Sequence, residues 1–270
     1  MPDVIVTGLP RSGATVVAAL IDYLPRAVCF NSPAAHIAYA RKQNNALPYG
    51  KWLAGDFIWR RAQLQRRQPL PDFRAADGSP FMDGQNDPKQ PRNESGKAAH
   101  VLFTRAKLEG DFILGMKHHV LYTALLPALV KFDHFKIIAV IRHPLDVLAS
   151  WQKLGMPPLA RGNPPGIGRL WPEALAIAEA EIDPIDRMVQ LYDLHLQRYH
   201  ELGEQVHIVK YEDVAHDPMT VSRLFGIKTR PANASMIEKR KRVHRVENAA
   251  LIRESLRKYG VFAREYYGDI

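Results

Sequence analysis

The sequence predicts an α/β fold in which helices flank a central parallel sheet. Short apolar runs rich in β-branched residues alternate with longer helical segments, a pattern typical of a parallel sheet covered on both faces. The chain has 270 residues, 46% of them hydrophobic, which is enough for one large domain with a sizeable core. We expect strands near residues 4–8, 27–30, 112–117, 136–141 and 206–210.

The first strand is followed by a loop typical of phosphate-binding proteins. Residues 8–15 read GLPRSGAT and lie between the apolar runs 4–6 and 16–21, so they predict a strand, a tight turn and a helix. A Walker A loop has the pattern G-x-x-x-x-G-K-[ST], and its lysine reaches the β and γ phosphates of a nucleotide. Ala14 stands at that lysine position, whereas Arg11 supplies a positive charge inside the loop. We therefore expect an anion other than a triphosphate tail at this helix N-terminus.

A second candidate anion site follows the strand at 136–141. Pro144 and Asp146 suit the first turn of a helix, which places Arg142 at the carboxyl end of the strand and Ser150 on the helix. A guanidinium with a nearby hydroxyl can clamp a phosphate through charge-assisted hydrogen bonds. The same arginine could instead form a structural ion pair or cap, and the sequence leaves both interpretations open.

The candidate polar residues all follow predicted strands. Parallel sheets bind ligands outside the carboxyl ends of their strands. The residues that follow the first, third, fourth and fifth strands are Arg11, His118, His119, Arg142 and Tyr211. We expect these side chains to meet in one crevice.

Four motifs occur in an order that resembles a known family. Segment 10–15, PRSGAT, and the pattern R-x-P-x-D-x-x-x-S at 142–150 resemble the two nucleotide signatures of sulfotransferases that use 3′-phosphoadenosine 5′-phosphosulfate (PAPS). Segment 112–119 is similar to the family's strand that ends in K-x-H, and segment 207–214 is similar to its Y-E-D-[LV] element. The resemblance runs from about residue 4 to 227 and implies the P-loop nucleotide-binding fold of sulfotransferases, of the bacterial small-molecule type.

The resemblance also implies how a cofactor is held. In that family the first loop binds the 5′-phosphosulfate, the second motif binds the 3′-phosphate, and the tyrosine lies near the adenine. The implied cofactor is PAPS, its product is adenosine 3′,5′-bisphosphate (PAP), and no metal is needed. The implied cofactor-binding residues are Arg11, Ser12, Gly13, Ala14 and Thr15 in the loop, Arg142 and Ser150 in the second motif, and Tyr211.

The implied reaction is in-line displacement of a sulfuryl group onto a hydroxyl or amine of a small-molecule acceptor. Negative charge grows on the bridging oxygen of the departing nucleotide, where we expect Arg11 to act, with Lys117 either assisting it or only lining the crevice. An imidazole suits the role of base at neutral pH. His119 fills the K-x-H pattern, and strand alternation would place it on the face of Lys117 with His118 turned away. His118 is the alternative base.

Three features depart from the family pattern. Ala14 replaces the first of two threonines in the loop, and Val16 replaces a tryptophan that stacks on the adenine in cytosolic members. The C-terminal R-K-G loop of those members has no literal match, and the basic run 238–245 either substitutes for it in charge or is a solvated surface. Two alternative functions stay open. One is a non-catalytic nucleotide-binding protein of this fold. The other is a P-loop small-molecule kinase, which would need a lysine in place of Ala14.

Two segments rich in proline and polar residues interrupt the single domain that we predict for residues 1–270. Residues 68–96 and 155–172 lack periodicity, and loops of this length in a compact domain are usually lids or binding segments, or else disordered. We expect both to border the acceptor pocket. Small-molecule sulfation, as in natural-product tailoring, fits this arrangement. A cationic or hydroxyl-rich acceptor would suit the acidic residues of the first segment, although such residues more often serve solubility: Asp72, Asp77, Asp83, Asp87 and Glu94.

Composition restricts the partners. The formal net charge of +9 fits a phosphorylated cofactor, and the absence of a basic motif interleaved with aromatic residues predicts no nucleic-acid partner. Cys29 is the only cysteine, which excludes an internal disulfide and a thiolate metal cluster, and we expect it to be a buried hydrophobic residue. No segment predicts a signal peptide or a membrane span. We therefore expect a cytoplasmic enzyme, with its oligomeric state left open.

Overall fold

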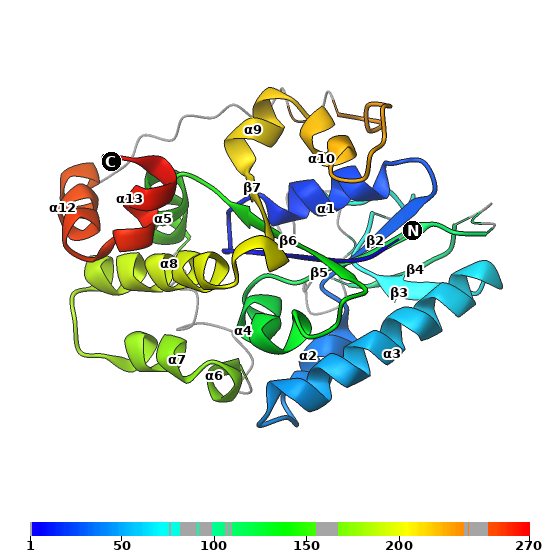
Figure 1. The fold of residues 1–270 in the computed structure, drawn as a ribbon, viewed down its shortest axis with the longest axis horizontal. Coiled ribbons are helices and arrows are strands. Elements are labelled where there is room, and N and C mark those ends of the chain that lie inside the picture. The colour runs from blue at the N-terminus through cyan, green and yellow to red at the C-terminus, as the bar shows by residue number, and fades with distance from the viewer. Residues whose placement is uncertain are drawn as a thin grey trace.

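The computed structural model confirms the predicted α/β class (Figure 1). It describes residues 2–75, 77–81, 91, 99–105, 108, 110–154, 167–234, 237 and 248–270. One sheet of five strands has the order β2-β5-β1-β6-β7, and each neighbouring pair is parallel. Its strands are β1 (Asp3–Gly8), β2 (Ala27–Asn31), β5 (Ile113–Lys117), β6 (Phe135–Ile141) and β7 (His207–Lys210).

The central strand of this sheet is β1, with β5 on one side and β6 on the other. Each of the five predicted strands agrees with an observed strand to within one residue at either end. After β1 the chain adds β2 and β5 on one side of that strand, and later β6 and β7 on the other side. The direction in which strands are added to the sheet therefore reverses at β1. A crevice at the carboxyl end of such a switch point is the usual ligand site of an open α/β sheet.

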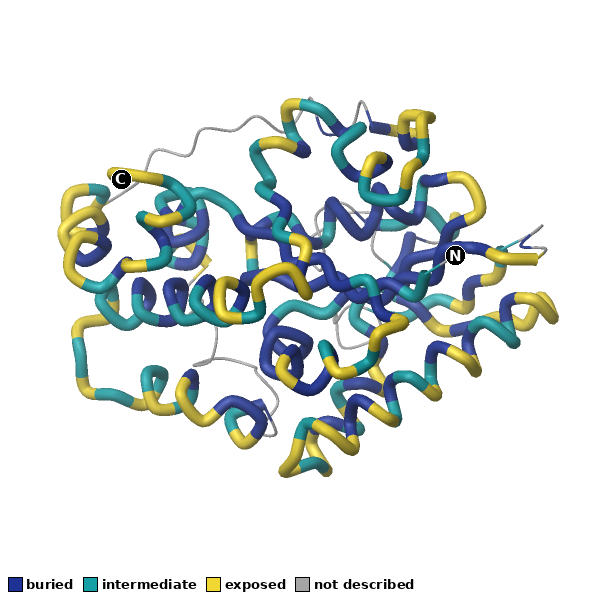
Figure 2. Tube along the Cα trace, viewed as in Figure 1, coloured by how far each residue is buried: buried dark blue, intermediate teal, exposed yellow. Residues whose placement is uncertain are grey.

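Both faces of the sheet are buried, as β6 shows. Ile137, Ala139 and Ile141 belong to one apolar cluster, and Ile138 and Val140 belong to the other. This alternation places successive side chains on opposite faces, where helices cover them. Figure 2 shows the resulting buried strands between helices whose outward sides are exposed.

Helices form a layer on each side of the sheet (Figure 1). The cluster on one face includes α1, α9 and α10, and the cluster on the other includes α3, α4, α5 and α8. The helices are α1 (Ala14–Asp22), α2 (Ala34–Ala40), α3 (Ala46–Gln65), α4 (Val120–Leu129), α5 (Pro144–Lys153), α6 (Ile167–Leu170), α7 (Pro172–Glu179), α8 (Pro184–Glu201), α9 (Tyr211–His216), α10 (Met219–Arg223), α12 (Ala249–Tyr259) and α13 (Val261–Tyr267), with a 3₁₀ turn at Gly203–Gln205.

Local sequence explains where the helices beside the site begin. Helix α5 has proline at its first position, and Asp146 in its first turn and Lys153 in its last turn complement the helix dipole. The Asp183 side chain caps α8 by accepting hydrogen bonds from the backbone N–H groups of Ile185 and Asp186. These signals fix the ends of helices that pack behind the crevice.

A short antiparallel pair lies beside the main sheet, formed by β3 (Leu70–Asp72) and β4 (Val101–Phe103). Buried Arg74 follows β3 and donates hydrogen bonds to Asp72 at 2.7 Å and to Asp22 of α1 at 2.7 and 3.0 Å. Arg105, just after β4, also donates to Asp22 at 2.8 Å. These ion pairs tie the β3–β4 pair, whose first strand lies in the first predicted lid, to α1 of the main body.

Parts of three predicted segments lie outside the described residues. They are residues 76, 82–90 and 92–96 of the first lid, with Asp83, Asp87 and Glu94, residues 155–166 of the second lid, and the basic run 238–245. Their roles remain predictions.

Candidate functional site

The turn between β1 and α1 forms a concave backbone loop. Arg11 and Gly13 have φ angles of 72° and 94°, and Gly8 has a φ of 152°. Successive N–H groups in such alternating conformations point inward and form an anion-binding nest. A side chain at Gly8 would place its Cβ 2.5 Å from the Val140 carbonyl oxygen and 2.7 Å from Ser12 Oγ. Glycine is therefore required where the loop leaves β1.

The N-terminus of α1 lacks the groups that usually satisfy a helix start. Gly13 is its N-cap and provides no side-chain hydrogen bond, and the first turn holds no acidic residue. The hydroxyl of Ser12 is buried and has no hydrogen-bond partner among the described residues. Unpaired backbone donors, the positive end of a helix dipole and an orphaned buried hydroxyl together fit a bound anion.

Tyr211 packs directly against the loop. It is the first residue of α9, directly after β7, and a Cβ added at Gly13 would lie 2.2 Å from the Tyr211 ring. The Arg142 guanidinium lies over the same ring, 4.8 Å from its centroid. The structure therefore brings Gly13, Tyr211 and Arg142 together, as the strand-end rule predicts.

The second predicted anion site adjoins the first. Arg142 donates to Asp146 through Nη2 at 2.7 Å and Nε at 3.1 Å, so the ion pair considered from the sequence is present. The Nε group of Arg11 donates to Ser150 Oγ at 3.0 Å. Residues assigned to separate phosphate sites thus touch one another across the crevice.

Hydrogen bonds from neighbouring elements fix the backbone around Arg142. The Tyr192 hydroxyl on α8 donates to the Arg142 carbonyl oxygen at 2.7 Å, and the His143 N–H donates to Glu212 Oε1 of α9 at 2.8 Å. Trp151 of α5 donates its indole N–H to the Pro10 carbonyl oxygen in the first loop at 2.8 Å. The last contact ties the second motif to the first loop directly.

Lys117 ends β5 and is almost fully buried, with 3% of its surface exposed. Its ammonium donates to Asn31 Oδ1 at 3.0 Å. Burial disfavours the charged form and lowers the pKa of Lys117 to about 7. The side chain is therefore poised between its charged and neutral forms near neutral pH.

His119 is placed by the start of α4 and not by a strand. Strand β5 ends at Lys117, and His119 is the N-cap of α4 with φ −65° and ψ −106°. Strand alternation therefore stops before the two histidines, because the chain turns into a helix there. The premise that both lie on an extended strand was wrong, and the choice of His119 as base stays a prediction. Thr7 Oγ1 donates to the His119 carbonyl oxygen at 2.7 Å and holds this turn against β1.

The imidazole of His119 keeps one uncommitted nitrogen. Burial and the nearby Lys117 and His118 lower its pKa well below the usual value, whereas a hydrogen bond with the Gly8 backbone raises it. Nδ1 is buried and has no hydrogen-bond partner within the described ranges, so this nitrogen is available to a bound molecule.

His118 points into different surroundings. Both of its ring nitrogens are inaccessible and lack a partner in the described part of the chain, and burial lowers its pKa to about 3. Its ring lies beside Tyr122, with centroids 5.7 Å apart. The Tyr122 hydroxyl is 2.6 Å from Nδ1 of His36, whose Nε2 is 2.8 Å from an Asp56 oxygen.

Sequence reasoning missed the groups that support these side chains. Asn31, Trp151 and Asp72 were not predicted to touch site residues. Asn31 ends the second strand, so the strand-end rule could have identified it. The contacts of Trp151 and Asp72 depend on tertiary packing that no local pattern reveals.

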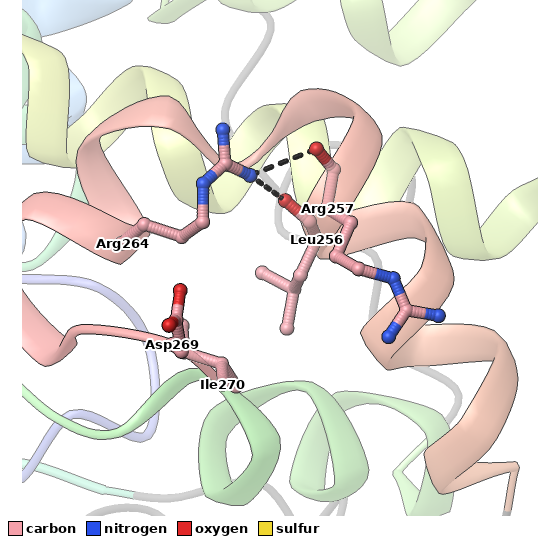
Figure 3. Close-up of a pocket in the computed structure, with 5 residues that line it drawn as sticks. All are labelled: Leu256, Arg257, Arg264, Asp269 and Ile270. Carbon is pink, nitrogen blue, oxygen red and sulfur yellow. Dashed lines mark hydrogen bonds between the residues drawn. The ribbon is translucent and has the colours of Figure 1, made fainter.

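A cavity elsewhere does not belong to this site. It has a volume of about 160 Å³, and its lining residues are Leu256, Arg257, Arg264, Asp269 and Ile270 (Figure 3). Arg264 Nη1 donates to the carbonyl oxygens of Leu256 and Arg257, so its guanidinium caps the end of α12. No predicted site residue lines this cavity.

Comparison with known proteins decides the family. A family model described as the sulfotransferase domain matches residues 1–239. This chain belongs to the sulfotransferase family. The match confirms the resemblance and the predicted class of enzyme, while no curated protein matches the sequence.

Three solved structures match the chain at low identity and low TM-score. Sulfotransferase STF9 from Mycobacterium avium is 14% identical, with a TM-score of 0.43 over 96% of this chain and 75% of that chain. Retinol dehydratase with androsterone and the inactive cofactor PAP is 16% identical, with a TM-score of 0.34 over 98% of this chain and 69% of that chain. Retinol dehydratase with retinol and PAP is 15% identical, with a TM-score of 0.33 over 99% and 70% of the two chains. These similarities are too distant to identify an acceptor.

Within the described residues, no three or more histidine, cysteine, aspartate or glutamate side chains are grouped as a metal would require. Among the helices of that same part of the chain, none is both long and apolar enough to cross a bilayer.

Proposed function

We propose that this sulfotransferase transfers a sulfuryl group from PAPS to a hydroxyl or amine of a small-molecule acceptor. The observation that carries the proposal is the loop after β1, where a buried Ser12 hydroxyl with no partner among the described residues adjoins a helix N-terminus that no side chain caps. An anion of the nucleotide would satisfy all of these donors together. The residues present therefore fit the cofactor that the family uses.

In this proposal the first loop holds the 5′-phosphosulfate, which supplies an activated sulfuryl group when bound. Ser12 would donate its hydroxyl, and the residues around Gly13 would donate backbone N–H groups. Thr15, in the first turn of α1, would add a second hydroxyl. Ala14 is fully buried and contributes only backbone, so the loop has no lysine for a γ-phosphate.

Arg142 and Ser150 would hold the 3′-phosphate. The ion pair with Asp146 uses the Nε and Nη2 groups of Arg142, so it fixes the plane of the guanidinium and leaves Nη1 for a phosphate oxygen. Ser150 would exchange its hydrogen bond from Arg11 for one to phosphate. Tyr211, packed between Gly13 and Arg142, would lie near the adenine.

Charge stabilisation on the departing nucleotide would come from Arg11 and Lys117. Arg11 lies in the loop and remains charged at all relevant pH values. Lys117 lies at the carboxyl end of β5, next to β1, where a protonated ammonium would stabilise growing negative charge. Anionic groups placed nearby would favour this protonated form.

His119 would take the proton from the acceptor. Its Nδ1, which has no partner among the described residues, would accept the proton, with the ring hydrogen on Nε2. Its lowered pKa keeps the ring neutral before reaction, as a base requires. His118 is the alternative, because its ring nitrogens are also uncommitted among the described residues.

Transfer of radiolabelled sulfate tests the function. The purified protein is incubated with radiolabelled PAPS and a panel of phenols, aliphatic alcohols and amines, with an Arg11→Ala variant as control. We expect label in at least one acceptor with the natural chain and a large loss with the variant. Tight PAP binding without transfer to any acceptor would favour a non-catalytic nucleotide-binding protein. Label transfer from γ-labelled ATP would instead indicate a kinase.

A further inference from the structure

Lys117 has an unusual partner for a buried ammonium. Its charged end donates to the neutral side-chain carbonyl of Asn31, and it forms no ion pair with any carboxylate that the structure describes. Buried charges in proteins are usually paired with an opposite charge. A neutral acceptor can orient an ammonium while leaving its charge uncancelled.

The sheet places Asn31 opposite Lys117. The two residues end neighbouring parallel strands, β2 and β5, and are partners in the strand register. The Ser32 N–H donates to the Lys117 carbonyl oxygen at 2.7 Å, which extends this pairing beyond the strand. Both side chains therefore leave the sheet at its carboxyl edge, where the candidate site lies.

Asn31 is itself fixed from the β3–β4 pair. Its backbone N–H donates to Asp72 Oδ1 at 2.8 Å, and the other oxygen of Asp72 accepts from Arg74 at 2.7 Å. Arg74 is buried and bonded to Asp22 of α1. A continuous hydrogen-bonded chain thus runs from α1 through β3 to the ammonium of Lys117.

We propose that Asn31 is a positioning residue, held by Asp72, whose neutral carbonyl aims the Lys117 ammonium into the site without cancelling its charge. The proposal rests on the function proposed above, since it gives Lys117 a role toward an anionic nucleotide. Aspartate at this position would pair with the lysine and repel that nucleotide. Alanine would leave the lysine without its acceptor.

Several groups set the charge of Lys117. Cys29 of β2 and Asp72 of β3 raise the pKa of Lys117 electrostatically, and Lys117 in turn lowers the pKa values of His118 and His119. Burial, which lowers the pKa of Lys117, outweighs the effects of Cys29 and Asp72, which raise it. A carboxylate at hydrogen-bond distance would favour the ammonium and raise the midpoint of its titration, whereas loss of the Asn31 acceptor would lower it.

The test follows the titration of Lys117 in the nucleotide-free protein by NMR of carbon-labelled lysine, with Lys117→Met used to assign the signal. We expect Asn31→Asp to raise the midpoint by at least about one pH unit and Asn31→Ala to lower it. Asn45→Asp is the matched control, because it makes the same charge change while an aspartate still caps α3. Equal midpoints in Asn31→Asp and Asn45→Asp would overturn the proposal.

A second measurement connects the residue to the reaction. We expect Asn31→Ala to lower single-turnover transfer by about tenfold with little change in PAP affinity, and Asn31→Asp to weaken PAP binding by about tenfold or more. A lower melting temperature with an unchanged titration midpoint would show that Asn31 is only structural and would overturn the proposal. Absence of transfer by the natural chain would contradict the proposed function, while the nucleotide-free titration would still decide the role of Asn31.

Discussion

At the scale of single residues, the site is marked by buried polar atoms that lack a protein partner. Ser12 Oγ and His119 Nδ1 are both buried, and neither has a hydrogen-bond partner among the described residues. Leaving such a group unsatisfied costs about 1–3 kcal/mol. A folded protein tolerates this cost most readily where a ligand completes the hydrogen bonds.

His119→Ala should abolish most sulfuryl transfer while leaving PAP affinity nearly intact. A general base contributes about 10²- to 10⁴-fold to rate, and this base would touch the acceptor proton and not the phosphates of the nucleotide. Single-turnover transfer and calorimetry on the same preparations measure the two effects. His118→Ala is the matched control and should do much less. The opposite order of effects would assign the base to His118.

Arg142→Ala should weaken PAP binding by about 1.5–3 kcal/mol, the usual loss for a hydrogen bond to a charged group. Its fold should survive, because the residue lies at the end of β6 and its pair with Asp146 is partly exposed. Calorimetry gives the affinity, and thermal unfolding gives the stability. Unchanged affinity combined with early melting would make Arg142 a structural residue.

At the scale of elements, the turn from β1 to α1 is the part that the sequence specifies most closely. A tight approach at Gly8 and a left-handed φ at Gly13 both require glycine there. The loop motif could therefore be found from residue spacing alone. The placement of His118 and His119 could not be found in this way, because α4 begins directly after β5 and no strand alternation reaches His119.

Gly13→Ala tests the loop as a structural unit. A Cβ there would lie 2.2 Å from the Tyr211 ring on a backbone with φ 94°, so we expect a loss of stability of about 1–3 kcal/mol and a large loss of PAP affinity. Urea unfolding and calorimetry measure these effects.

Gly55→Ala is the matched control for that prediction. Gly55 lies inside α3, and an added Cβ there would contact nothing within 4 Å. Alanine should stabilise this helix by about 0.5–1 kcal/mol. A similar response of both variants would show that the loop has no special need for glycine.

At the scale of the whole molecule, the fold class and all five strands of the main sheet could be predicted, since each strand is a separate apolar run. The site was predictable only in outline. Lys117 meets Asn31 because β2 and β5 are neighbours in the sheet although they are distant in sequence. Arg11 meets Ser150 for the same kind of reason, across β1 and α5. Strand order is a tertiary property, and local patterns do not encode it.

The most direct test of the central claim is a calorimetric comparison of PAP and ATP binding to the natural chain under identical conditions. Ala14 removes the lysine that a γ-phosphate needs, whereas Arg142 and Ser150 offer a site for a 3′-phosphate that ATP lacks. We expect PAP to bind at least about tenfold more tightly, a difference of about 1.4 kcal/mol. Equal or tighter binding of ATP would contradict the claim.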